Sequence, residues 1–301
     1  MSRGHDSRTP LPSREPEQGR EPDQQLRAGT GHAPERAAVR PSETRGRSAH
    51  AAEPRNVHEI RSRTYRVRPS EVQGMVELGK FRAIAQEDLI EFFYDGDKNR
   101  FRLDLENLIR QGLVQAKAVP HETTGSRTLL TLTMLGHRFV TETQAAGKDQ
   151  VLYHGFTKPR EAHHDADLYR LYQKASEKIA RQGGKNLRVV LDYEMKKRIC
   201  HDLAKIGEER NSSVRKREIA EGYQLQMVCG KIPVPDIRLE YETRDGEKAR
   251  IDLELATGHY RGRSLAEKVR AGFAIYAHGD EASKLRKILD QRELAAEILS
   301  L

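Results

Sequence analysis

The 301-residue sequence predicts a mixed α+β and α/β protein preceded by an N-terminal tail without regular structure. Three observations predict this fold class. The composition changes near residue 55, apolar residues then recur at helical spacing, and a later segment alternates apolar and polar residues on both sides of an Asp-Gly turn. We therefore expect a disordered tail over 1–55, a first domain over 56–146 and a second domain over 160–301.

The composition limits the classes to which the protein can belong. Charged residues make up 33% of the chain, and the formal net charge is +8. No run of residues approaches the ~20 apolar positions of a membrane-spanning helix, and the first residues lack the apolar core of a secretory signal. The two cysteines, Cys200 and Cys229, cannot supply a disulfide framework. We expect a cytoplasmic protein that does not bind a membrane. The excess of basic over acidic residues suggests a polyanionic binding partner.

The tail has the composition of a disordered segment. Residues 1–55 contain no aromatic residue and no Lys, and seven of the twelve prolines lie there. Such a segment cannot bury enough apolar surface to offset about 1–2 kcal/mol of backbone entropy per ordered residue. Its ten Arg and eight acidic residues leave it nearly neutral, so we expect a solvated tail rather than a DNA-binding arm.

The segment after the tail predicts three helices, a β-hairpin and a fourth helix, in that order. Apolar residues recur with helical period, Ser70 after Pro69 can cap the first helix, and Gly112 fits the end of the third. The expected helices cover 70–81, 86–94, 99–113 and 136–143, and the expected strands cover 114–119 and 128–135.

This order of elements, with the segments LENLIRQGLV and TLLTLTMLGHRFV, resembles a winged helix-turn-helix domain. The resemblance implies that the third helix enters the major groove of double-stranded DNA. A small α+β domain that binds protein is the alternative, and a homodimer is compatible with both. The expected DNA contacts are the polar side chains off the apolar stripe of the third helix and one basic residue of the wing: Asn99, Arg100, Arg102, Arg110 and Arg127.

The second domain predicts helices interleaved with strands. Gly183-Gly184 ends the first of these helices, and Asn211 interrupts a long polar helical segment. The expected helices cover 160–182, 194–223, 264–276 and a terminal segment after Ala277, and the expected strands cover 187–193 and 223–230, with a hairpin over 232–258.

The register of the hairpin over 232–258 follows from its alternation. A two-residue loop at Asp245-Gly246 would place apolar residues opposite charged ones, because a slip by one residue exchanges the two faces of a strand. A three-residue loop that begins at Arg244 pairs 237 with 253, 239 with 251 and 241 with 249, and puts Gly246 where a left-handed residue is needed. It also predicts the ion pairs Arg238–Asp252 and Glu240–Arg250.

The same register sets Asp236 opposite Glu254. Two facing carboxylates, with β-carbons roughly 5 Å apart, destabilise a hairpin unless their charge is neutralised. Mg²⁺ binds one or two carboxylates and keeps water ligands for phosphate chemistry. We therefore predict that Asp236 and Glu254 are ligands of Mg²⁺.

Pro235-Asp236, a hairpin, an acid-rich strand and a helix resemble the core of the PD-(D/E)XK restriction-endonuclease-like superfamily. The resemblance implies that Asp236 and Glu254 bind metal and that a Lys polarises the attacking water. The motif position of that Lys is Ala256, so Lys268 in the following helix is the candidate for the role. The superfamily core also has a strand after that helix, and the sequence pattern predicts none there.

A winged helix followed by this core resembles the replication-relaxation proteins of plasmids and other mobile elements. Their loose motif is met by Pro235-Asp236, Glu254, Thr257-Gly258 in reversed order, Lys268 and Tyr276. The resemblance implies a DNA-binding protein that acts as a metal-dependent endonuclease or nickase. The alternative is a non-catalytic replication or transcription accessory protein with a degenerate nuclease-like domain, and a protein–protein adaptor is a third hypothesis.

Two further groups of residues are rival sites. Asp192, Glu194 and Lys196 follow a predicted strand, and they can complete the same metal site, supply its Lys, or place acids at the favourable start of a helix. His163 and His164 are adjacent, so on a helix they point about 100° apart. We expect these two histidines to be polar helix-start residues rather than metal ligands.

Overall fold

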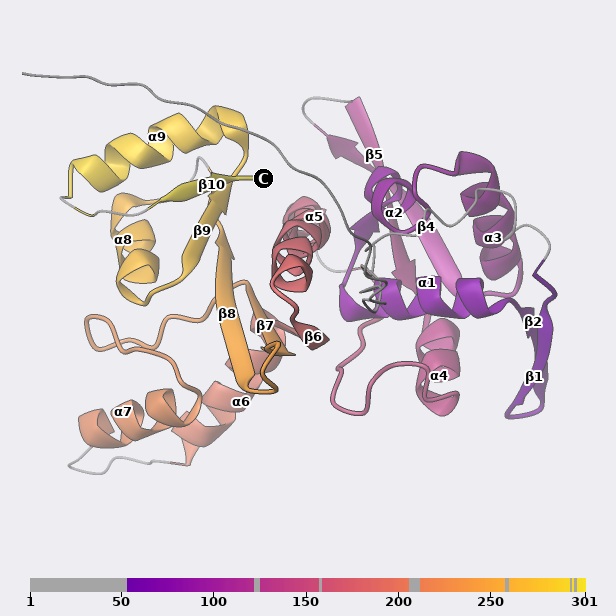
Figure 1. Cartoon of the computed structure of the whole chain (residues 1–301), viewed down its shortest axis with the longest axis horizontal. Helices are drawn as coiled ribbons and strands as arrows, with labels where there is room; N and C mark the ends of the chain where they lie inside the picture. Colours follow the sequence, from indigo (N-terminus) through magenta and orange to yellow (C-terminus); the bar gives the residue numbers. More distant parts are fainter. Residues whose placement is uncertain are drawn as a thin grey trace, which may run out of the picture. The chain divides into compact units, whose positions relative to one another are not determined.

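The computed structural model describes residues 53–121, 125–156, 159–205, 212–257, 260–292, 294 and 297–301, and these form a mixed α+β structure with sheets of two, three and five strands (Figure 1). The chain divides into two compact units, 1–45 and 46–301, and the described residues all belong to the second. The predicted disordered tail lies outside the described residues except for its last three positions. Within the described part, no helix is long and apolar enough to cross a membrane.

The first half of the described chain confirms the predicted helices and hairpin. Asp97 caps α3 by accepting a hydrogen bond from the backbone of Arg100, and Gly112 follows the helix with a φ of +70°. The first helix begins at Pro69, with Arg68 rather than the predicted Ser70 as its N-cap. The elements are β1 (Asn56–Ile60), β2 (Arg63–Val67), α1 (Pro69–Lys80), β3 (Ile84–Ala85), α2 (Gln86–Phe92), α3 (Lys98–Arg110), β4 (Val114–His121), β5 (Gly125–Leu132) and α4 (Met134–Glu142). Strands β3, β5 and β4 form an antiparallel sheet in that order.

The second half contains a mixed five-stranded sheet in the order β10-β9-β8-β7-β6. Strands β6, β7 and β8 are antiparallel to one another, whereas β9 and β10 run parallel to β8. The elements are α5 (Pro159–Arg181), β6 (Lys185–Leu191), α6 (Asp192–Ala204), α7 (Ser212–Gly222), β7 (Ile237–Glu242), β8 (Lys248–Leu255), α8 (Gly262–Arg270), β9 (Ala274–Ala277), α9 (Gly279–Asp290) and β10 (Ile298–Ser300).

The predicted register of the β7–β8 hairpin is confirmed. Ile237 pairs with Leu253, and the backbone N–H of Thr243 donates to Glu247, which closes a three-residue loop whose Gly246 has a φ of +82°. The predicted Arg238–Asp252 ion pair is formed, with Nε 2.6 Å from Oδ1. The residues of the second predicted ion pair, Glu240 and Arg250, also lie opposite each other, but each bonds to another partner. Glu240 accepts a hydrogen bond from Arg188 of β6, and Arg250 donates one to the carbonyl oxygen of Gln224.

One predicted strand of the second half is wrong, and two predicted helices are present but extend too far. Residues 223–230 form no strand and contribute only an isolated bridge between Val228 and Lys231. The predicted helix over 264–276 ends at Arg270, and its last residues form β9. The predicted terminal helix ends at Asp290, and Ile298 lies in β10. Short buried parallel strands are apolar without alternation, so their pattern cannot be distinguished from that of a helix.

Apolar clusters cover both faces of the five-stranded sheet. On one face lies α5, whose fully buried Tyr169 packs edge-on against Phe81 of the first half, with ring centroids 5.3 Å apart (Figure 1). One continuous cluster thereby joins the first half to Ile237 and Leu253. The other face is covered by α6, α8 and α9, with buried residues that include Met195, Leu265, Ile275 and Leu285.

Candidate functional site: a buried pair of carboxylates

The structure brings together the two predicted metal-binding acids. The register of β7 and β8 places Asp236 beside Glu254, and the backbone N–H of Asp236 lies 3.3 Å from Oε2 of Glu254. The backbone N–H of Leu255 donates to Oδ2 of Asp236 at 2.9 Å. Asp192, at the end of β6, is level with them, because its N–H donates to the carbonyl oxygen of Asp236. The three acidic residues therefore lie at the same level: Asp192 directly follows β6, Asp236 directly precedes β7 and Glu254 lies near the end of β8.

Lys268, the predicted partner of these acids, reaches them from the last turn of α8. Its Nζ lies 2.7 Å from Oε1 and 2.8 Å from Oε2 of Glu254, and it also donates to the carbonyl oxygen of Val234 at 2.7 Å. The lysine thus forms a bidentate ion pair with Glu254, which is 0% exposed.

Two residues that sequence reasoning did not assign to this site complete it. The Tyr260 hydroxyl donates to Oε1 of Glu254, and Nε2 of His164 lies 3.6 Å from Oδ1 of Asp236. His164 continues the apolar stripe of α5 through Leu168 and Leu171, so its spacing indicated a position facing the sheet. The sequence carries no signal for the contact of Tyr260 with Glu254.

Burial and charge set the protonation states of the two acids in opposite directions. Burial, reinforced by the charge of Asp236, raises the pKa of Glu254 to about 7 although Lys268 opposes the shift. Burial also acts on Asp236, but His164 and the charge of Lys268 outweigh it and lower its pKa. Burial opposes the charging of His164, but the nearby carboxylate of Asp236 outweighs this effect and raises the pKa of the histidine. Asp236 is therefore the ionised acid, and Glu254 takes up a proton first.

This arrangement does not fit a resident divalent cation. Both oxygens of the fully buried Glu254 are engaged by Lys268, and Asp236 accepts from a backbone N–H and faces His164. Across the described ranges, no group of three or more His, Cys, Asp or Glu side chains could hold a metal ion. The basic side chains beside the two carboxylates are Lys268, which contacts Glu254, and His164, which lies 3.6 Å from Asp236.

The three residues of the rival site, Asp192, Glu194 and Lys196, do not lie together: two are beside Asp236 and Glu254, and the third is elsewhere. At the start of α6, Nζ of Lys196 lies 2.6 Å from Asp192. Burial opposes the charged form of this lysine, but the hydrogen bond to Asp192 and the charge of that carboxylate raise its pKa, with smaller contributions from Asp236 and Glu254. Glu194 instead forms ion pairs with Arg188 and Arg198, each at 2.7 Å. Asp192 and Lys196 therefore border the buried pair, whereas Glu194 does not take part in it.

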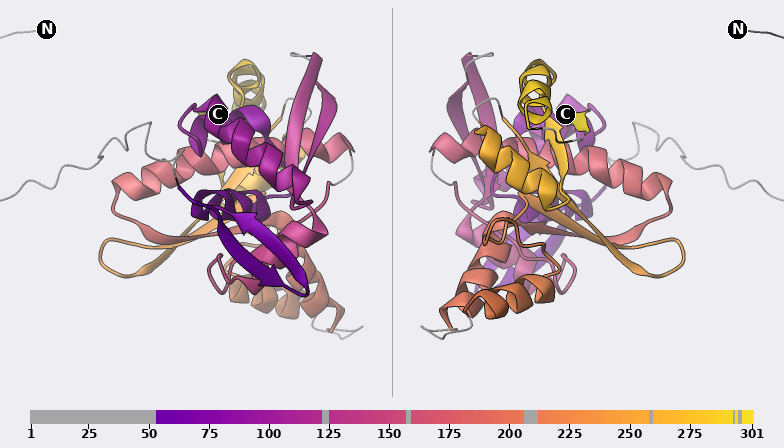
Figure 2. Two further views of the ribbon diagram at one scale, coloured as in Figure 1. Left: turned by 90° about the vertical axis from the view of Figure 1, so that its right-hand side faces the viewer. Right: turned by 90° about the vertical axis from the view of Figure 1, so that its left-hand side faces the viewer.

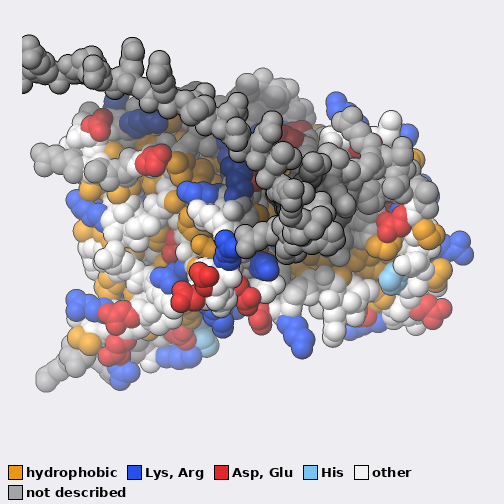
Figure 3. Space-filling model, viewed as in Figure 1, with side chains coloured by type: hydrophobic (Ala, Val, Ile, Leu, Met, Phe, Trp, Pro, Cys, Tyr) orange, Lys and Arg blue, Asp and Glu red, His pale blue; other side chains and the backbone are white. Residues whose placement is uncertain are grey.

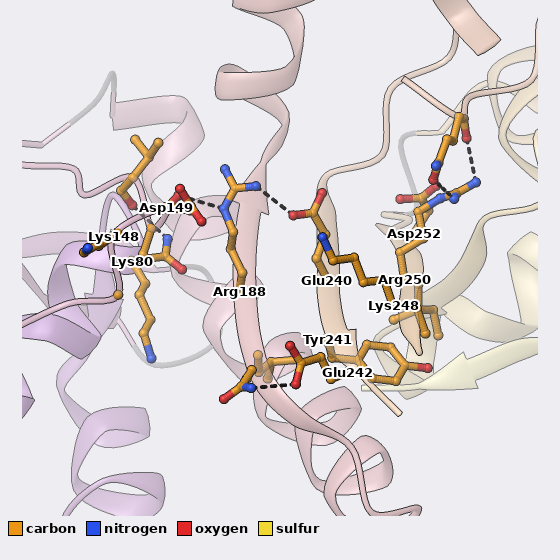
Figure 4. A pocket seen from close by; sticks show the side chains of 18 of the residues that line it. Lys80, Lys148, Asp149, Arg188, Glu240, Tyr241, Glu242, Lys248, Arg250 and Asp252 are labelled. Atoms are coloured by element: carbon orange, nitrogen blue, oxygen red, sulfur yellow. Dashed lines mark hydrogen bonds and ion pairs between the residues drawn. The ribbon is translucent and has the colours of Figure 1, made fainter. Parts of the chain in front are cut away.

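A separate groove of about 1670 Å³ lies beside the polar ends of β6, β7 and β8 (Figure 4). Arg188 crosses it and donates to Glu240 and to the carbonyl oxygen of Asp149, each at 2.7 Å. Basic and acidic side chains both line the groove, and neither Asp236 nor Glu254 is among its lining residues. The buried pair and the groove are therefore distinct features.

The predicted DNA contacts differ in their accessibility. Asn99, Arg102 and Arg110 are exposed on α3, whereas Arg100 is half-buried with its guanidinium 5.4 Å from the ring centre of Tyr94. On the face drawn in Figure 3, basic side chains are interspersed with acidic ones, so charge alone does not mark a DNA-binding region there.

Arg127 does not occupy the exposed position predicted for it. It is 9% exposed, and its guanidinium lies 2.5 Å from Glu87, 2.8 Å from Asp88 and 2.6 Å from Asp167. The three carboxylates accept hydrogen bonds from the guanidinium N–H groups of Arg127, so this side chain connects β5 to α2 and α5. It is not retained as a DNA contact.

Comparison with known proteins identifies no relative: no family model, no curated protein and no solved structure matches this chain.

Proposed function

We propose that this chain is a DNA-binding accessory protein of a plasmid or mobile element, with a winged helix over 56–146 and a non-catalytic, nuclease-like domain over 160–301. The observation that carries the non-catalytic assignment is the bidentate contact of Lys268 with the fully buried Glu254. This contact supplies within the chain the positive charge that a nuclease obtains from a metal ion.

The order of elements in the first half supports the winged helix. Three helices, α1, α2 and α3, precede the β4–β5 hairpin, and β3 adds a third strand to that hairpin. In such a domain α3 enters the major groove. Its exposed Asn99, Arg102 and Arg110 have the donors that base edges and phosphates accept.

The second half supports the nuclease-like domain. The β7–β8 hairpin has the predicted register, Lys268 reaches Glu254 from the next helix, and β9 follows that helix parallel to β8. This strand is the element that the resemblance to the PD-(D/E)XK superfamily requires and that the sequence pattern lacked.

A Mg²⁺-dependent endonuclease acting in replication or relaxation is the second candidate. The convergence of Asp236, Glu254 and Lys268 favours it, because these are the residue types that such enzymes use. This function requires Glu254 to exchange Lys268 for a cation, so it predicts a second arrangement of the same residues.

One pair of assays tests the proposal. A duplex of about 20 base pairs should be retarded at low salt and released as salt rises, because phosphate contacts release counterions. Supercoiled plasmid incubated with Mg²⁺ or Mn²⁺ should stay intact with the wild type and with Asp236→Ala. Metal-dependent nicking that the variant loses would establish the endonuclease, and absence of duplex binding at low salt would favour the protein–protein adaptor.

A further inference from the structure

We propose that the β1–β2 hairpin is a second DNA-contacting element, in which Arg63 and Arg66 bind backbone phosphates beside the duplex segment that α3 contacts. The inference rests on the proposed DNA-binding function and adds to it a surface that no motif in the sequence marks. It begins from how the hairpin is attached to α3.

The hairpin is held against the C-terminal end of α3. Gln111, which follows α3, accepts a hydrogen bond from the backbone N–H of Arg66 at 2.8 Å and donates to its carbonyl oxygen at 2.9 Å. Asn107 of α3 donates to the same carbonyl oxygen at 3.1 Å. Two side chains of this helix region therefore position the backbone of Arg66.

The opposite face of the hairpin is packed against the domain. Ile60, Tyr65 and Val67 are buried, and the ring of Tyr65 lies 5.5 Å from that of Phe139 in α4. Figures 1 and 2 (left) place the hairpin and α3 side by side on the same side of this unit. Successive side chains of a strand point to opposite faces, so Arg66 points away from this packed face, whereas Arg63 lies on the face of Tyr65, at the exposed tip of the hairpin. The packing holds the backbone of both arginines in a constant position relative to α3.

The charged side chains of this region divide into two groups. Arg55 and Arg68 serve the fold, because they form ion pairs with the buried carboxylates of Glu71 and Asp104. Exposed basic residues remain along the hairpin and the end of α3. Within the described part of the chain, these residues form no ion pair: Arg63, Arg66 and Arg110.

The turn at the tip of the hairpin contains residue types that are unusual for its backbone conformation. Ile60 pairs with Arg63, so Arg61 and Ser62 form a two-residue loop, and both have positive φ values, +44° and +65°. Asn and Gly are strongly preferred in such a turn. Strained backbone of this kind concentrates at functional sites, and here it supports a role for the hairpin tip.

Phosphate is the chemistry that fits this surface. A guanidinium presents a planar fork of donors that matches phosphate oxygens, and it stays charged at all relevant pH values. Guanidinium groups beside a groove-binding helix that contact phosphates fix the position of a protein on a duplex without selecting its sequence. The expected ligand of Arg63 and Arg66 is therefore the sugar–phosphate backbone of double-stranded DNA.

Fluorescence anisotropy with a labelled 20-base-pair duplex tests the inference. The full-length wild type is compared between about 50 and 200 mM KCl with Arg63→Gln/Arg66→Gln and with Lys284→Gln/Lys287→Gln. The control pair loses the same charge from exposed positions of α9. Thermal unfolding of all three proteins establishes that they are folded equally.

The hairpin variant should bind about tenfold more weakly at 100 mM KCl. Its log–log salt slope should be shallower by about two, because each phosphate contact contributes about 0.9 to the slope. The control should stay within about twofold of the wild type. Equal affinity and slope for the hairpin variant and the wild type would overturn the inference and leave DNA binding intact, as would equal losses in both variants. A wild type that binds no duplex at low salt would overturn both proposals.

Discussion

Asp88 in the first half and Glu254 in the second are equally buried carboxylates that are neutralised by different groups. Asp88 is 0% exposed between the guanidinium groups of Arg127 and Arg170. Glu254 is contacted by the ammonium of Lys268 and the hydroxyl of Tyr260. Burial raises the pKa of both acids, and that of Glu254 reaches about 7.

The two acids differ in function: Asp88 belongs to a permanently charged structural contact, whereas Glu254 can exchange the charge of its lysine partner for a proton. Arginine stays charged and holds its partner in a fixed bidentate geometry, whereas lysine is a mobile point charge whose pKa changes readily. The carboxylate of Asp88 therefore joins α2, β5 and α5 permanently. Glu254 is close to its protonation midpoint at neutral pH, so a proton can replace the charge of Lys268 as the group that neutralises it.

The largest loss of stability is expected when the arginine contact of the first half is removed. Arg127→Ala leaves Asp88 and Asp167 without their shared partner in a buried place, so the free energy of unfolding should fall by about 3–5 kcal/mol. Urea denaturation at pH 7 measures it. Arg102→Ala, which removes an exposed pair with Glu106, should change stability by less than about 1 kcal/mol. Similar losses in both variants would remove the structural role assigned to Arg127.

The second expected effect is a pH dependence carried by Glu254. Its pKa rises from 4.5 to about 7 on folding, so between these values the folded state binds more protons than the unfolded state. Stability that this group contributes below pH 4.5 is therefore lost as pH rises towards 7. Glu254→Gln should lessen this fall by roughly 3 kcal/mol, at about 1.4 kcal/mol per unit.

Urea denaturation of wild type and Glu254→Gln between pH 4.5 and 8 tests this dependence. Glu106→Gln serves as a control, because Glu106 is exposed and should leave the pH profile unchanged. Parallel profiles for Glu254→Gln and the wild type would mean that Glu254 keeps an ordinary pKa.

A smaller effect is expected when the lysine of the second site is removed. Lys268→Met keeps the length of the side chain but removes the charge beside Glu254. Above pH 7 the variant should lose about 2 kcal/mol, because the buried carboxylate has to remain unpaired or take up a proton. At pH 5 Glu254 is protonated in both proteins, so the loss should be below about 1 kcal/mol. A loss of equal size at both values would contradict the exchangeable character of the site.

The smallest effect is expected for the hydroxyl of Tyr260. Tyr260→Phe removes one donor to Glu254 and leaves Lys268 in place, so at pH 8 it should cost about 1 kcal/mol. Thermal unfolding compared with Tyr193→Phe, whose side chain is exposed, measures the difference. An unchanged stability would show that Lys268 alone neutralises the acid.

The β7–β8 hairpin and its acids were predictable because their pattern is local. Alternation around Gly246 allows only one register that keeps apolar residues on one face, and that register necessarily sets Asp236 beside Glu254. Lys268 was predicted from the resemblance rather than from a pattern, and the structure places it on Glu254.

Other parts of the site and fold depend on contacts between distant segments. His164 and Arg127 carry ordinary polar patterns, and their partners lie 72 and 40 residues away respectively in the chain. Strands β9 and β10 were predicted as helices because segments of three or four mainly apolar residues fit either structure. Only the pairing of β9 with β8 and of β10 with β9 decided between them.

The sequence by itself determined the helices of the first half, the hairpin register and the meeting of two carboxylates, because each follows from periodicity within a short segment. The tertiary structure alone decided what neutralises those carboxylates and which arginines are buried. The free energy of a buried charge depends on every group around it. Those groups come from α5, from α8 and from Tyr260, and only the folded chain brings them together.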